Sequence, residues 1–218
     1  MVLRGLQTLL ERLYDVDPDH DVYDYLVTDR RKLAAFEPEN DRRGPEEELL
    51  LAETHDGAGV ALYIDDGLLS RLERENPLGA LTESNLADFC TALEGVSHFL
   101  YSTWRLGNDS AVSLIELETQ AEVDKYAAAV FLIADQQGGD FPAQVHARLF
   151  DQVSFDERLE PEQYQRYLTA HRCAAKYCRA LEQRFVKRGQ ARVEALVREL
   201  RKFYRLGSTA KLRHALAS

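Results

Sequence analysis

The sequence predicts a mainly α-helical protein of the α+β type, with a bundle-like helical core and one small β-hairpin near residues 48–65. Apolar residues recur at helical spacing through most of the chain after Leu81, and one pair of apolar runs is separated by an Asp-Gly turn. The composition, 45% hydrophobic and 29% charged, is typical of a folded globular protein. Because no apolar run reaches the roughly 18 residues of a membrane helix, we expect no membrane partner.

The N-terminal region is expected to contain two helices. Five leucines within residues 3–14 share one helical stripe, and the acidic run 15–21 ends that helix. The aspartates of this run alternate as in an EF-hand loop, but His20 and Leu26 occupy the positions that need Gly and Glu. We therefore interpret the run as an acidic cap of a second helix, which is predicted over about 21–36, and the alternative is a looser divalent-cation site formed by the alternating carboxylates.

The predicted hairpin follows a polar loop over residues 37–48. Its two apolar runs, 49–54 and 60–64, flank an Asp-Gly dipeptide that favours a tight turn. A turn into a short helix is expected over residues 65–72. Since an isolated hairpin is only marginally stable in water, its apolar face is expected to lie against helices or on a third strand from elsewhere in the chain.

The rest of the chain is predicted to be mostly helical. Helices are expected over residues 83–105, 110–134 and 142–152, and two longer helices are expected to start at Pro161 and near Val193. Residues 112–117 also fit a strand. Because the last two helices are separated by a tight connection at Gly189, we expect an antiparallel pair. The chain is expected to be one compact unit, with a helical appendage over residues 1–40 and a main domain over 41–218.

Charge is unevenly distributed along the chain. The net charge is −10, but residues 161–218 carry a net +10 and residues 1–160 a net −20. Such asymmetry indicates either pairing of the two halves within one fold or a basic face offered to a partner. The acidic half would repel phosphate at long range, which counts against strong non-specific DNA binding. The candidate residues for binding a polyanion or a partner are Arg172, Lys176, Arg179, Arg184, Lys187, Arg188, Arg198, Arg201 and Lys202.

Several chemistries are disfavoured because their motifs are missing. The chain has no G-x-x-x-x-G-K-[ST] loop, no G-x-S-x-G elbow, no H-E-x-x-H and no C-x-x-C. Its cysteines, Cys90, Cys173 and Cys178, are odd in number, and the spacing of the last two on one helix is unsuited to a disulfide. Free thiols, together with a start that lacks the pattern of a signal peptide, lead us to expect a cytoplasmic protein.

Carboxylates and histidines in the middle of the chain form the main candidate site. Glu94 and His98 lie four residues apart on one predicted helix, as do Glu118 and Glu122 on the next, and this spacing puts each pair on one helix face. If the helices pair, His171 on a third helix is placed to join them. Dinuclear iron and manganese bundles use such groups, but with Glu-x-x-His on two helices, a motif that this chain lacks. The alternatives are a metal site formed by these five residues and a solvated acidic face beside a core histidine.

Three functions are compatible with these features. The leading hypothesis is a non-enzymatic interaction or regulatory module that uses its charged surfaces for self-association, for example as a dimer, or for docking a protein partner. The first alternative is a metal-binding helical-bundle enzyme with a divalent metal as its cofactor, whereas the other hypotheses require no cofactor. The second alternative is nucleic-acid binding through the basic C-terminal helices. The burial of the carboxylates and the packing of residues 1–40 stay open at this point.

Overall fold

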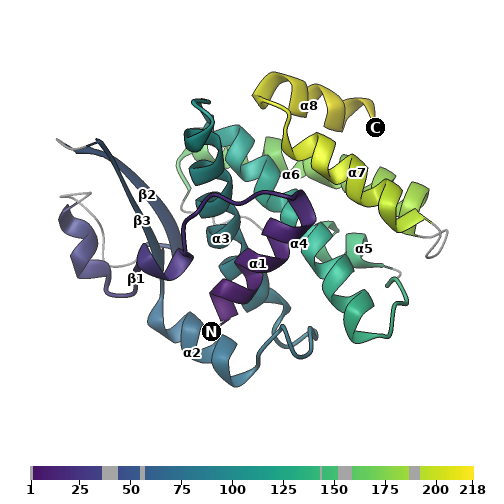
Figure 1. Ribbon diagram of the computed structural model, residues 1–218, viewed down its shortest axis with the longest axis horizontal. Helices are drawn as coiled ribbons and strands as arrows, with labels where there is room; N and C mark the ends of the chain where they lie inside the picture. The colour runs from purple at the N-terminus through teal and green to yellow at the C-terminus, as the bar shows by residue number, and fades with distance from the viewer. Residues whose placement is uncertain (1, 36–43, 55–56, 143, 152–158, 187–191) are drawn as a thin grey trace.

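The computed structural model describes residues 2–35, 44–54, 57–142, 144–151, 159–186 and 192–218. Within these ranges the prediction of a mainly α-helical fold with a small β element is confirmed (Figure 1). The helices are α1 (Val2–Tyr14), α2 (Asp66–Arg74), α3 (Leu86–Gly107), α4 (Leu114–Gln136), α5 (Val145–Phe150), α6 (Pro161–Leu181), α7 (Val193–Tyr204) and α8 (Ser208–Ala217). No helix in the described ranges is both long enough and apolar enough to cross a bilayer.

The sheet has three strands in the order β1-β3-β2. Strands β2 (Glu47–Thr54) and β3 (Gly57–Ile64) are antiparallel, so the predicted hairpin is confirmed. The third strand is the short β1 (Leu26–Val27), which runs parallel to β3 and places Leu26 opposite Leu62.

The predicted helix over residues 21–36 is wrong. Instead, the short 3-10 helices η1 (Val22–Asp24) and η2 (Arg30–Ala35) lie on either side of β1. The Asp21 side chain caps η1 by accepting a hydrogen bond from the Tyr23 backbone N–H, and the Leu62 N–H donates to the Tyr25 carbonyl at 2.9 Å. Residues 26–27 pair with the open edge of β3, and this pairing adds backbone hydrogen bonds between distant segments of the chain. The helical periodicity of the sequence gives no sign of such long-range contacts.

Helix α3 covers one face of the sheet, and the two elements meet at Gly95. A Cβ atom at Gly95 would lie 2.8 Å from Glu47 Oε2, 3.0 Å from Ile64 Cδ1 and 3.1 Å from Leu62 Cδ1. The missing side chain therefore leaves room for the ends of the Glu47, Leu62 and Ile64 side chains against the helix. On the opposite face, Leu33 of η2 packs with Leu50, Ala61 and Tyr63 in a small second cluster.

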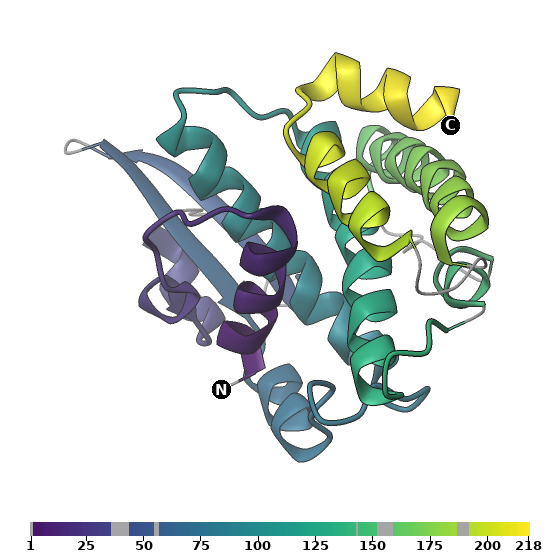
Figure 2. The same ribbon diagram turned by 45° about the vertical axis from the view of Figure 1, so that its right-hand side comes forward.

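Helix α4 lies at the centre of the helical core, between α3 and α6 (Figure 2). Its three consecutive alanines, residues 127–129, are all buried, which is expected of a helix packed on several sides. The alternative of a strand over residues 112–117 is not realised, because α4 begins at Leu114. Leu3, Leu6 and Leu10 of α1 are fully buried in the same core, against α3 and α7.

The C-terminal region contains a helix that the sequence did not indicate. Helix α6 begins at Pro161, as expected, with a capping box between Glu160 and Gln163. A π-helical turn, η3 (Glu182–Val186), extends it. After α7 the chain turns back as α8, which packs on α6 and α4 and buries Lys211 completely. Helices α6 to α8 lie at the end of the molecule away from the sheet (Figure 1).

Candidate functional site

The five predicted metal candidates lie together between three packed helices. Glu94 and His98 of α3 face Glu118 and Glu122 of α4, and His171 of α6 approaches Glu122 from the other side. Because α3 packs on α4 and α4 on α6, the i, i+4 pairs of the sequence meet inside the bundle. Glu118 and His98 are buried, so the alternative of a wholly solvated acidic face does not describe this part of the chain.

The first half of the cluster is the triad of Glu94, His98 and Glu118. One nitrogen or oxygen atom from each residue lies within 4.8 Å of the others. His98 Nε2 is 3.6 Å from Glu118 Oε2, which is too long for a hydrogen bond. This nitrogen has no hydrogen-bond partner among the residues that the structure describes, although the His98 side chain is only 9% exposed. The triad thus holds an unsatisfied ring nitrogen beside two carboxylates.

Glu47 of β2 joins the triad from the sheet, and the sequence analysis missed it. Its Oε2 atom is buried beside Gly95 and lacks a hydrogen-bond partner among the described residues. Burial raises the pKa of Glu47 to about 8, an effect that Glu94 and Glu118 reinforce and His98 opposes. The sequence did contain a signal for this position, because alternate residues of a strand share one face of the sheet. Glu47 therefore lies on the same face as Leu49, which packs on the main core.

The charge on His98 is stabilised by its acidic neighbours. Burial by itself disfavours the imidazolium, but the carboxylates of Glu118, Glu47 and Glu94 outweigh it and raise the pKa of His98 to about 9. Arg166 of α6 lies on the far side of Glu118, with Nε 3.8 Å from Oε1. Glu118 is therefore flanked by two cationic groups.

The second half of the cluster is centred on Lys125, which the sequence analysis also missed. Its ammonium nitrogen lies 2.6 Å from Glu94 Oε2 and 2.7 Å from Glu122 Oε1. Glu122 Oε2 is in turn 3.1 Å from His171 Nδ1. Burial would raise the pKa of Glu122, but Lys125 and His171 reverse this and hold it at about 2. The same carboxylates hold the pKa of Lys125 well above its usual value against the effect of burial.

The two halves form one continuous ionic network that spans three helices and the sheet. Glu94 belongs to both halves, since it contacts Lys125 and is a member of the triad. Lys125 and Arg166 place positive charge beside Glu94 and Glu118, and the protonated imidazole of His98 adds a third positive group when no metal is bound. An imidazole with several carboxylates is a mixed nitrogen and oxygen donor set, which suits divalent manganese, iron or zinc.

The basic candidates are divided between exposed and partly buried positions. Arg201 is partly buried against the end of α1, where it donates to the backbone carbonyls of Leu13 at 2.9 Å and Arg12 at 3.1 Å, and it lies 3.4 Å from Asp15. Arg179 is exposed but pairs with Asp151 at 3.4 Å. The exposed members of the set are Arg172, Lys176, Arg179, Arg184, Arg198 and Lys202. Lys187 and Arg188 lie outside the described residues.

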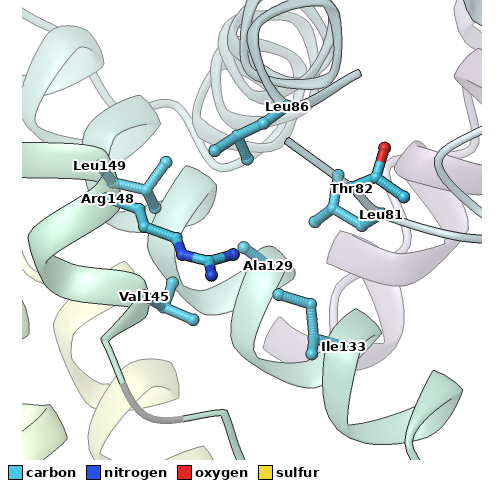
Figure 3. A pocket seen from close by; sticks show the side chains of 8 residues that line it. All are labelled: Leu81, Thr82, Leu86, Ala129, Ile133, Val145, Arg148 and Leu149. Carbon is cyan, nitrogen blue, oxygen red and sulfur yellow. The ribbon is translucent and has the colours of Figure 1, made fainter. Parts of the chain in front are cut away.

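A small cavity elsewhere in the core offers no reactive groups of this kind. It has a volume of about 20 Å³ and lies where α4 and α5 meet the segment that leads into α3 (Figure 3). Its lining is aliphatic apart from Thr82 and Arg148, and the remaining lining residues are Leu81, Leu86, Ala129, Ile133, Val145 and Leu149. The cavity includes none of the candidate site residues.

Comparisons with known proteins bring no further assignment. The chain matches no protein-family model, no curated protein and no solved structure. The functional argument therefore depends on the geometry of the network alone.

Proposed function

We propose that this protein binds one divalent metal ion through the triad of Glu94, His98 and Glu118, with Glu47 as a fourth donor. The observation that carries the proposal is that two potential metal donors at this cluster, His98 Nε2 and Glu47 Oε2, are buried without a hydrogen-bond partner among the described residues; the Arg166 Nε donor beside Glu118 is the third such atom here. Buried polar atoms almost always have a partner, and these two potential metal donors lack one beside the carboxylates of Glu94 and Glu118. A divalent ion bound here would take the place of the His98 proton, because a ligating imidazole must be neutral. The triad atoms, all within 4.8 Å of one another, are close enough to converge on one ion after small side-chain rotations.

The donor set favours a first-row transition metal. Calcium and magnesium prefer sites made of oxygen alone, whereas the imidazole of His98 favours Mn²⁺, Fe²⁺ or Zn²⁺. Lys125 Nζ lies 2.6 Å from Glu94 Oε2, and Arg166 Nε lies 3.8 Å from Glu118 Oε1. Such contacts orient metal ligands and make up a large part of a site's affinity.

Metal titration of the purified full chain tests this proposal. After removal of metal with a chelator, we expect calorimetry with Mn²⁺ or Zn²⁺ to give one site per chain. Replacing a ligand, as in His98→Gln or Glu118→Gln, is expected to weaken binding at least about tenfold, since even residues that only support a ligand contribute about 10- to 100-fold.

Glu116→Gln is the matched control for these variants. Glu116 is a buried glutamate of the same helix, but it accepts a hydrogen bond from the Tyr101 hydroxyl at 2.5 Å and lies outside the triad. Its replacement is expected to leave the metal affinity unchanged. The proposal is wrong if the apo protein takes up none of these metals, or if the ligand variants and the control bind equally well.

Self-association through charged surfaces is a second candidate function. Arg172 on α6 and Lys202 on α7 are exposed, and neither has an acidic partner within the part of the chain that the structure describes. Residues 1–160 are acidic and residues 161–218 basic, and such opposite charges speed the encounter of two copies and orient them. Light scattering should then show a dimer at low salt that dissociates at high salt. A monomer at every protein and salt concentration would contradict this candidate.

A further inference from the structure

The sheet has an open edge along β2. In the strand order β1-β3-β2, β2 lies outermost, and no segment in the described part of the chain pairs with its outer side. Its eight residues pair with β3 one by one from Glu47 to Thr54, without a bulge. Edge strands of natural proteins are usually short, or they are interrupted by a bulge, a proline or a lysine. The central run of β2, residues 49–52, reads Leu-Leu-Leu-Ala and contains no such interruption.

The backbone groups that point out of this edge can be assigned. In an antiparallel pair, the N–H and C=O of a residue point to the same side, and alternate residues point to opposite sides. The Asp65 N–H donates to the Glu46 carbonyl at 2.8 Å, so the even-numbered residues of β2 point to β3. The N–H of Leu62, the residue opposite Leu49, donates instead to the β1 side of β3. Both observations direct the N–H and C=O groups of Leu49 and Leu51 to the open edge.

Leu51 combines these outward backbone groups with an exposed apolar side chain. The residue is 53% exposed, although Leu49 packs on the main core and Leu50 is only 5% exposed. Burial of a leucine side chain favours association, and an added strand supplies the hydrogen bonds that an open edge lacks. The position therefore fits a partner strand that has an apolar residue opposite Leu51.

We propose that β2 pairs with β2 of a second copy of this chain, antiparallel and with Leu51 at the two-fold axis, so that the two sheets join into one of six strands. Each Leu51 N–H then donates to the Leu51 carbonyl of the other copy. Leu50 lies opposite Ala52 and Glu48 opposite Thr54, so no two acidic residues of β2 are opposite each other. Because a two-fold contact uses the same patch on both copies, it closes as a dimer.

This interface differs from the charged surfaces considered above in its place and in its expected salt dependence. The exposed cations Arg172 and Lys202 belong to α6 and α7, at the end of the molecule away from the sheet (Figure 1). Each copy has a net charge of −10, so two copies repel each other, and salt screens that repulsion. A dimer through β2 is therefore expected to persist at high salt, whereas a dimer through opposite charges dissociates.

Sedimentation of the full chain at low and high salt tests the inference. We expect a wild-type dimer that persists at high salt. Leu51→Pro removes the outward N–H of the central residue but no hydrogen bond to β3, so we expect a folded monomer whose association is weakened at least about tenfold. Leu51→Lys places two like charges at the axis and is expected to have the same effect. Circular dichroism checks that both variants stay folded.

Leu216→Lys is the matched control for these variants. Leu216 of α8 is 54% exposed, close to the 53% of Leu51, but it lies outside the sheet. Its replacement removes a similar exposed apolar side chain and should leave the dimer unchanged. Amide hydrogen exchange of the wild type gives a second measurement. The Leu49 amide should exchange more slowly at high protein concentration than at low, whereas the Leu50 amide, which points to β3 in the monomer as well, should change less.

The outcomes are distinct. Loss of the dimer in both Leu51 variants, with the Leu216→Lys protein still dimeric, supports the inference. A monomer at every protein and salt concentration overturns it, as does a dimer that survives both Leu51 variants or that Leu216→Lys disrupts equally. A dimer that dissociates at high salt but tolerates Leu51→Pro supports the charged-surface candidate instead. Because none of the triad residues belongs to β2, each of these results leaves the metal proposal to its own test.

Discussion

Lys211 provides a direct test of how burial acts on charge in this fold. The residue is fully buried in α8, where its ammonium nitrogen lies 2.9 Å from the Tyr101 hydroxyl and 2.5 Å from Gln120 Oε1. Burial lowers the pKa of Lys211 to about 7, although Glu116 and Asp124 attract the charge and oppose the shift. Lys211→Met keeps an unbranched side chain of similar length and removes the titrating group.

The expected effect is a change of stability with pH. The unfolded chain holds the Lys211 proton up to a pKa of about 10.4, whereas the folded chain releases it near pH 7. Between these values the unfolded state binds more protons, so the contribution of Lys211 to the free energy of unfolding becomes more favourable as the pH rises. The limiting slope is about 1.4 kcal/mol per pH unit, and because Lys211 is half-titrated at pH 7, the gain from pH 7 to pH 9 is about 2 kcal/mol.

Urea unfolding of wild type and Lys211→Met at pH 7 and pH 9 measures this gain. The raised pKa values of Glu47 and His98 make their own contributions fall as the pH rises, but these are common to both proteins and cancel in the difference. We expect the stability of wild type relative to the variant to increase by about 2 kcal/mol over this range. Lys202→Met removes an exposed lysine and should show no such trend. An equal difference at both pH values would refute the reasoning.

Two further predictions concern close packing around the site. Gly95→Ala places a Cβ atom 2.8 Å from Glu47 Oε2 and 3.1 Å from Leu62 Cδ1. We therefore expect urea unfolding to show a free energy of unfolding lower by about 1–3 kcal/mol, despite the better helix propensity of alanine. A variant at least as stable as wild type would show that these side chains are not held at this distance. Burial raises the pKa of Cys90 to about 12, so its thiol should react with a disulfide reagent at pH 8 far more slowly in the native protein than in urea. Equal rates in the two conditions would contradict this.

Local patterns were sufficient to predict much of the fold. Helices α3, α4 and α6 and the hairpin of β2 and β3 follow from residue spacing, caps and turn residues, which act over a few positions. The same periodicity placed Glu94 with His98 and Glu118 with Glu122 on shared faces. These pairs were accessible from the sequence because the helical repeat alone determines which side chains are neighbours.

Long-range packing decided what the sequence left open. Strand β1 replaced the predicted second helix because the edge of β3 was available for pairing, and α8 returned to the core through Lys211. Glu47 and Lys125 became parts of the site because β2 rests on Gly95 and because α4 is enclosed by α3 and α6. The sequence by itself determined which groups share a helix face, whereas tertiary structure decided which faces lose contact with water. That loss depends on surfaces brought together from distant parts of the chain, and it turns a set of acidic side chains into a largely enclosed ionic network.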